Sequence, residues 1–140
     1  MTILVNLRQL GKKRNAVSAV PFALPGQPDT VRGLIIAVVQ ACVAAYNERV
    51  RRGETGIRPM TAESLADLET IGKLAFGVNY GGGEADEATA IANALQGFED
   101  GLYRVFLGQE ELTALDAALA LSAGDELTFI RLTMLTGSIF

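Results

Sequence analysis

Few side chains in this sequence are suited to catalysis. The 140 residues include no histidine and a single cysteine, Cys42. Without histidine the chain lacks the commonest general base, triad member and metal ligand, and one cysteine alone does not make a zinc site. Tyr103, Lys73 and the carboxylates remain as acid–base groups. From this composition we predict that the protein is not an enzyme and uses no metal or cofactor.

Two further patterns have the residue types of ligand sites but not their spacing. The glycine run at 81–83 lacks the Lys-Ser or Lys-Thr of a phosphate-binding loop, and we interpret it as a hinge. Four adjacent acidic pairs could bind a hard cation, but neighbouring side chains on a helix or strand point in different directions, and no calcium-loop spacing is present. We interpret these pairs as solvated surface: Asp86-Glu87, Glu99-Asp100, Glu110-Glu111 and Asp125-Glu126.

Charge is unevenly divided along the chain. Residues 1–58 contain nine basic and three acidic residues, whereas residues 59–140 contain three basic and thirteen acidic ones. The formal net charge of −4 gives no general attraction to nucleic acid or to an anionic membrane. A polarised surface can orient a protein partner. The alternative is that the two halves neutralise each other within the fold or in a dimer.

Two basic clusters lie in the first half of the chain. Lys12-Lys13-Arg14 falls in a turn between two expected strands, where a solvated turn is a better interpretation than a nucleic-acid contact. The second cluster could bind an acidic protein partner, or could only complement the negative end of a helix. Its members, our candidate protein interface, are Arg49, Arg51, Arg52 and Arg58.

The elements that must position these groups begin with a hairpin and a helix. Residues 2–10 alternate in the pattern of a strand, and residues 17–24 return as a second strand, whose Pro21 favours a sheet edge. A long apolar helix follows. Its expected N-cap is Asp29 or Thr30, it ends near residues 51–53, and it carries Cys42 as a small hydrophobic residue in its apolar stripe.

The second half is expected to contain two shorter helices and then strands. One helix starts at Thr61, and another carries Ala88, Ile91, Leu95 and Phe98, with Asp86 and Glu87 at its favoured N-terminal end. Strands are predicted at 102–107, very briefly at 111–112, and at 126–135, the last with Leu127 and Phe129 on one face.

This order of elements resembles ubiquitin. The resemblance lies in the N-terminal hairpin, in Pro28-Asp29-Thr30-Val31 opening the helix, in the run from Tyr103 to Leu112, and in the last strand within Leu119 to Leu135. It covers roughly residues 2–52 and 102–137. It implies an α+β fold of the ubiquitin-like β-grasp type, one domain over 1–140, whose mixed sheet packs on one long helix and whose last strand lies parallel beside the first. Residues 53–101 would be a mostly helical insertion between that helix and the third strand.

The resemblance also implies a function. The chain is expected to bind other proteins of unknown identity through the open sheet face or the insertion. An alternative is a ubiquitin-like modifier or sulfur carrier, which would require removal of the three residues after Gly137. A structural protein that forms a homo-oligomer is a third possibility.

We expect a cytoplasmic location, because one cysteine suits a reducing compartment, the N-terminus lacks a signal-peptide pattern, and the longest apolar stretch, 34–45, is too short to cross a bilayer.

Overall fold

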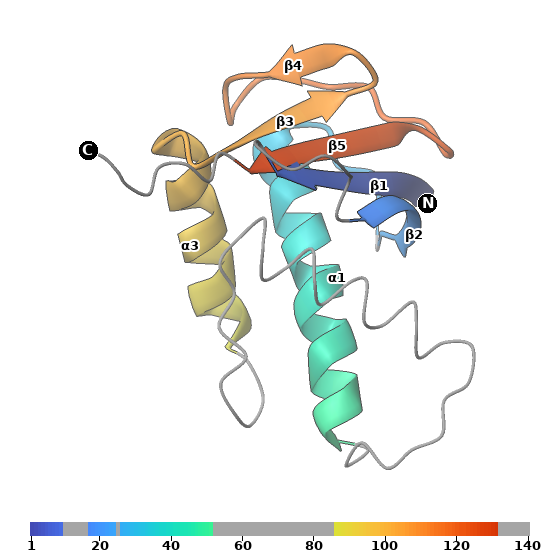
Figure 1. Cartoon of the computed structure of the whole chain (residues 1–140), viewed down its shortest axis with the longest axis vertical. Helices are drawn as coiled ribbons and strands as arrows, with labels where there is room; N and C mark the ends of the chain where they lie inside the picture. Colours follow the sequence, from blue (N-terminus) through green and yellow to red (C-terminus); the bar gives the residue numbers. More distant parts are fainter. Residues whose placement is uncertain (10–16, 25, 52–85, 132–140) are drawn as a thin grey trace.

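The computed structural model describes residues 1–9, 17–24, 26–51 and 86–131. Over these residues the fold is α+β, with a mixed five-stranded sheet and two helices on one face of it (Figure 1). The elements in chain order are β1 (Thr2–Gln9), β2 (Val17–Ala23), α1 (Val31–Arg51), α3 (Glu87–Glu99), β3 (Tyr103–Leu107), β4 (Glu110–Leu112) and β5 (Glu126–Arg131).

The two terminal strands lie side by side in the middle of the sheet. The strand order is β2-β1-β5-β3-β4. β1 and β5 are parallel, in register from Leu4 opposite Glu126 to Gln9 opposite Arg131, and the other neighbours are antiparallel. The predicted pairing of the first and last strands is therefore confirmed, and β2, with Pro21, is an edge strand as expected.

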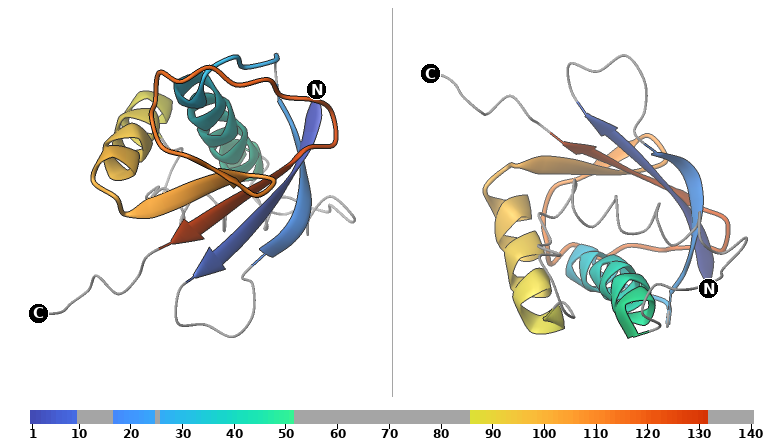
Figure 2. Two further views of the ribbon diagram at one scale, coloured as in Figure 1. Left: turned by 90° about the horizontal axis from the view of Figure 1, so that it is seen from above. Right: turned by 60° about the horizontal axis from the view of Figure 1, so that its bottom comes forward.

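The core lies between the sheet and α1, which crosses one face of the sheet (Figure 2). The alternation of β1 and β5 places their inward side chains in this core, and the helical repeat of α1 supplies the opposing layer. The fully buried inward residues are Ile3, Val5, Leu7, Val105, Leu127 and Phe129 from the sheet, and Val31, Leu34, Ile35, Val38, Val39 and Cys42 from α1. Each of these faces was predicted from the periodicity of its segment.

The start of α1 is held by a side chain and by a distant loop. Thr30 is the N-cap, because its hydroxyl oxygen accepts a hydrogen bond from the backbone N–H of Gly33 at 3.0 Å. The two N–H groups before that of Gly33 also have partners. The N–H of Val31 donates to the Ala117 carbonyl at 3.1 Å, and that of Arg32 donates to the Leu115 carbonyl at 2.8 Å. These bonds satisfy donors that a helix leaves open at its N-terminus, and they tether the segment after β4 to α1.

α1 is also the one described helix that is long and apolar enough to cross a membrane. The 18-residue window Val31–Glu48 has a mean hydropathy of 1.3, and half of it is buried inside the fold. The core helix of a soluble protein meets the same criterion, so this window is weak evidence for a membrane span.

The helix α3 is observed where it was predicted, and its most buried face is made of small residues. The buried positions are Ala90, Ala94 and Gly97, whereas Ile91 and Leu95 are only partly buried. A Cβ added at Gly97 would meet the ring of Tyr103 at 3.3 Å, so the small residue at this end of α3 makes room for a side chain of β3. The expected N-terminus is confirmed, with Asp86 as the N-cap.

β1 and β2 contain an irregularity centred on Ala19. The register of the pair shifts between Val5 and Leu7, and Ala19 has a φ of +53°. A residue with a Cβ is strained in this left-handed region by roughly 1–2 kcal/mol. The backbone N–H of Ala19 donates to the Asn6 side-chain oxygen at 2.7 Å, which gives this irregular backbone a partner that the regular ladder would otherwise supply.

Replacing Ala19 by glycine is therefore expected to stabilise the fold by about 0.5–1 kcal/mol. Glycine removes the Cβ strain at positive φ, and this gain exceeds the extra entropy that glycine adds to the unfolded chain. Urea denaturation measures the change, and Ala23→Gly, at an exposed position of the same strand, is the control expected to be destabilising. A loss of stability in Ala19→Gly would contradict the strained geometry.

Candidate functional site

The basic cluster predicted as a protein interface falls largely outside the described residues. Arg49 and Arg51 lie in the last turns of α1, but the description does not extend to their side chains, and Arg52 and Arg58 lie beyond it altogether. The candidate terminus Gly137 also lies outside the described residues, as do Lys73 and the glycine run at 81–83. These assignments stay predictions.

Tyr103, one of the acid–base groups considered from the sequence, is placed in the core. Its side chain is 2% exposed, and its hydroxyl donates to the Ala94 carbonyl of α3 at 2.6 Å. Burial raises its pKa far above the usual value near 10. Its ring stands edge-on to Phe98 and to Phe129, at centroid distances of 6.1 and 6.0 Å. Tyr103 thus joins α3 to the sheet, and it is poorly suited to proton transfer.

This burial has a measurable consequence at high pH. Because the pKa of Tyr103 is raised in the folded state, the folded protein holds a proton that the unfolded chain releases near pH 10, so stability is expected to fall as the pH rises above that value. Absorbance at 295 nm should show the ionisation of Tyr103 as a late step that coincides with loss of the circular dichroism signal.

Tyr103→Phe is the matched variant for that titration. It is expected to lose the late ionisation step and to cost about 1 kcal/mol at neutral pH, the usual net value of one hydrogen bond. An unchanged late step in the variant would show that another tyrosine is responsible.

Two of the acidic pairs contribute a carboxylate that accepts a backbone hydrogen bond. Asp86 accepts hydrogen bonds from the backbone N–H and the hydroxyl of Thr89, which lower the pKa of its carboxyl group. Asp125 accepts from the backbone N–H of Ser122 at 2.8 Å and so closes the turn before β5. Within the described ranges, no group of three histidine, cysteine, aspartate or glutamate side chains could hold a metal ion.

The sheet face opposite the helices carries a mixed apolar and basic surface. Arg8 of β1, Ile130 of β5 and Arg104 of β3 stand opposite one another in register on three adjacent strands. Neighbouring strands are about 4.8 Å apart, so the two arginines start about 10 Å apart on either side of Ile130. Phe106, two residues further along β3, lies on the same face. We call Arg8, Arg104, Phe106 and Ile130 the outer-face patch.

Solvent reaches every member of the outer-face patch. Arg8 and Arg104 are exposed, and Phe106 and Ile130 are half-buried. Arg104 makes a loose ion pair with Glu111 of β4, at 3.8 Å, with 57% of the arginine side chain exposed. Such an exposed pair contributes little energy. The arginine can therefore exchange this contact for one with a partner.

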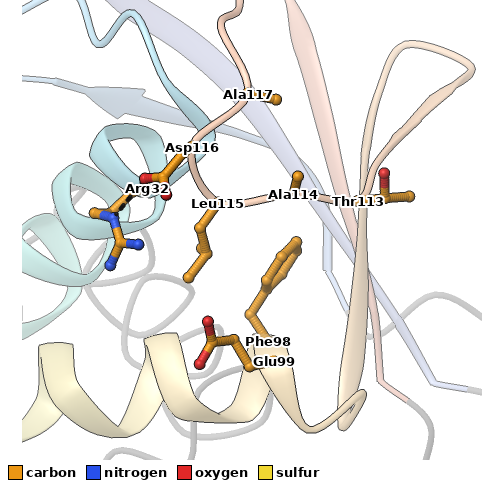
Figure 3. A pocket seen from close by; sticks show the side chains of 8 residues that line it. All are labelled: Arg32, Phe98, Glu99, Thr113, Ala114, Leu115, Asp116 and Ala117. Atoms are coloured by element: carbon orange, nitrogen blue, oxygen red, sulfur yellow. Dashed lines mark hydrogen bonds and ion pairs between the residues drawn. The ribbon is translucent and has the colours of Figure 1, made fainter.

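A hollow lies on the other side of the sheet, where the helices pack, between the start of α1, the end of α3 and the segment after β4. Its volume is about 530 Å³. Phe98 and Leu115 provide apolar walls, and three charged side chains, Arg32, Glu99 and Asp116, stand at its rim (Figure 3). The Arg32 guanidinium pairs with the Asp116 carboxylate at 3.2 Å.

Comparison with known proteins gives no match to this chain among protein-family models, curated proteins or solved structures. The two surfaces described above are therefore the features of this protein that bear on its function. The sequence pointed to the open sheet face only in general terms, and it gave no sign of the hollow. The one available signal for the outer-face patch was that Arg104 and Phe106, like Thr128 and Ile130, are two residues apart and so share a face of their strand.

Proposed function

We propose that this chain is a ubiquitin-like β-grasp domain that binds other proteins without catalysing a reaction. The arrangement expected from the resemblance was a hairpin, a helix across one sheet face, and a last strand parallel to the first. The observed strand order and the parallel β1–β5 pair support it. On this proposal, α3 belongs to an insertion over residues 53–101 between α1 and β3.

The outer-face patch is the observation that carries the binding proposal. Half-buried Ile130 lies between two exposed arginines, and half-buried Phe106 lies next to Arg104 on the same strand, so the patch offers hydrophobic contact together with anion recognition. A partner segment that matches them has an apolar residue to lie on Ile130 and Phe106, with carboxylates on either side to meet Arg8 and Arg104. Charges placed in this way set orientation and specificity more than affinity.

The test is affinity capture from cells that naturally make the protein, compared between the wild type and two variants. Ile130→Glu places a negative charge at the centre of the patch, where it repels acidic partners. Ala23→Glu adds the same charge at an exposed position on the edge strand β2. Both variants are first shown to keep the thermal unfolding midpoint within a few degrees of the wild type.

We expect partners that the wild type and Ala23→Glu capture equally and that Ile130→Glu depletes at least tenfold, as measured by quantitative mass spectrometry. A tenfold loss corresponds to about 1.4 kcal/mol, which is modest for the centre of an interface. Identical capture by all three proteins would remove the support for this surface.

The alternative is a modifier or sulfur carrier processed after Gly137. The observation that favours it is the position of β5, whose last described residue, Arg131, precedes Gly137 by a short segment. Intact-mass measurement on protein isolated from its native cells decides between the two. A chain lacking Ser138, Ile139 and Phe140 supports processing, and a full-length C-terminus argues against it.

A further inference from the structure

We propose that the hollow between α1, α3 and the segment after β4 is a second binding site, which takes an arginine-bearing apolar segment of another protein. We call it the α1–α3 groove, defined by Arg32, Phe98, Glu99 and residues 113–117. It lies on the helix side of the sheet, so it is separate from the outer-face patch and does not depend on it (Figure 3).

The walls of the groove are fixed before any ligand binds. The Leu115 carbonyl accepts the N–H of Arg32 at 2.8 Å, and the Ala117 N–H donates to the Ala114 carbonyl at 3.1 Å. The ring of Phe98 lies edge-on to the buried ring of Tyr103. A site whose walls are already ordered loses little conformational entropy on binding.

The shape and the apolar walls set the size of the occupant. A volume of about 530 Å³ lies within the range of small-ligand sites and exceeds what one side chain fills. Phe98 is half-buried and Leu115 is 6% exposed, so a ligand that covers them removes further apolar surface from water. An aliphatic side chain next to a charged one suits both the walls and the rim.

The charge at the rim selects a cation. Arg32 already has a partner in Asp116, whereas Glu99 is exposed and makes no ion pair with any residue of the described ranges. Two of the three charged residues that line the groove, Glu99 and Asp116, are acidic, so the local field at its rim is negative. An anionic ligand would have to displace Asp116 from Arg32 against this field.

Arginine matches the groove better than lysine does. Its planar guanidinium can lie on the face of Phe98 while it donates two parallel hydrogen bonds to one carboxylate. At the same rim, the Nε of Arg32 donates one hydrogen bond to the carboxylate of Asp116 at 3.2 Å.

The test is a titration of the full-length, ¹⁵N-labelled protein with the capped dipeptide acetyl-Leu-Arg-amide, followed by NMR. We expect chemical-shift changes confined to residues 98–99, 113–117 and Arg32, with a dissociation constant in the millimolar range, as is usual for so small a ligand. Acetyl-Leu-Glu-amide, of the opposite charge, is expected to leave these signals unchanged.

Glu99→Gln is the diagnostic variant and Glu110→Gln its control. Both variants remove one exposed carboxylate. Glu99 lies in the last turn of α3, at the negative end of the helix dipole, so removing its negative charge is not expected to destabilise the helix. We expect Glu99→Gln to bind the arginine dipeptide about tenfold more weakly, and Glu110→Gln to bind it as the wild type does.

Three results would overturn the proposal. The first is the absence of shifts at the groove, or equal affinity in Glu99→Gln and the wild type. The second is stronger binding of the glutamate dipeptide, which would make Arg32 the recognising group. The third is a set of groove signals that shift with protein concentration when no peptide is present, since the occupant would then be a second copy of this chain.

Discussion

Replacing Phe129 by alanine is expected to lower the free energy of unfolding by about 3–5 kcal/mol, the usual cost of removing a large aromatic side chain from a core. Phe129 is 0% exposed and lies on the central strand β5, opposite Leu7 of β1 and Val105 of β3. Its ring also contacts that of Tyr103. The cavity would open between strands that are held on both sides, so it cannot readily collapse.

Urea denaturation monitored by circular dichroism measures this loss, and Phe106→Ala is the matched control. Phe106 is the same residue type on the neighbouring strand, but it faces the other side of the sheet and is half-buried. We expect it to cost about 1 kcal/mol or less, because solvent fills the space that it leaves. Similar losses in both variants would mean that the inward and outward faces of the sheet have been assigned wrongly.

The second large effect is expected at Asn6, the one buried polar side chain found among the described residues. Its amide oxygen accepts the N–H of Ala19 at 2.7 Å, and its amide nitrogen donates to the Thr128 hydroxyl at 3.2 Å. Asn6→Ala removes both bonds and leaves the Ala19 N–H without its acceptor. A donor deprived of its partner costs about 1–3 kcal/mol, and we expect a loss in that range.

Thr128→Val separates the two hydrogen bonds of Asn6. It removes only the bond to the amide nitrogen and keeps a β-branched side chain on the strand, so the expected loss is about 0.5–1.5 kcal/mol. Hydrogen exchange of the Ala19 amide gives an independent measure: it should accelerate in Asn6→Ala and stay slow in Thr128→Val. Slow exchange in both variants would argue against Asn6 as the acceptor.

Much of the fold could be predicted because it depends on local periodicity. The repeat of two in β1 and β5 and the repeat of 3.6 in α1 identify their inward faces, and the N-cap before α1 was narrowed to two candidates, of which Thr30 is the one observed. The helix α3 was also predicted, from Ala88, Ile91, Leu95 and Phe98 at helical spacing, and it is observed. Periodicity did not show that its buried positions are Ala90, Ala94 and Gly97, the last of which lies against the ring of Tyr103.

The binding surfaces could not be predicted in the same way. Alternation places Arg8, Arg104 and Ile130 on the outward faces of three strands, but it does not say which strands are neighbours or which residues stand opposite. Those positions follow from the parallel register of β1 and β5 and the antiparallel register of β5 and β3. The groove likewise needs Arg32, Phe98 and Asp116 to meet, from segments far apart along the chain.

By itself, the sequence determined which residues face inward, where the main elements begin, and that histidine chemistry is excluded. The tertiary structure alone decided that Tyr103 is a buried link and not an acid–base group, and it alone brought together the outer-face patch and the α1–α3 groove. The physical reason is the distance along the chain over which each interaction acts. Side-chain direction within an element is fixed by its own backbone geometry, whereas the neighbour across a strand or a helix end is chosen by long-range burial of the whole core.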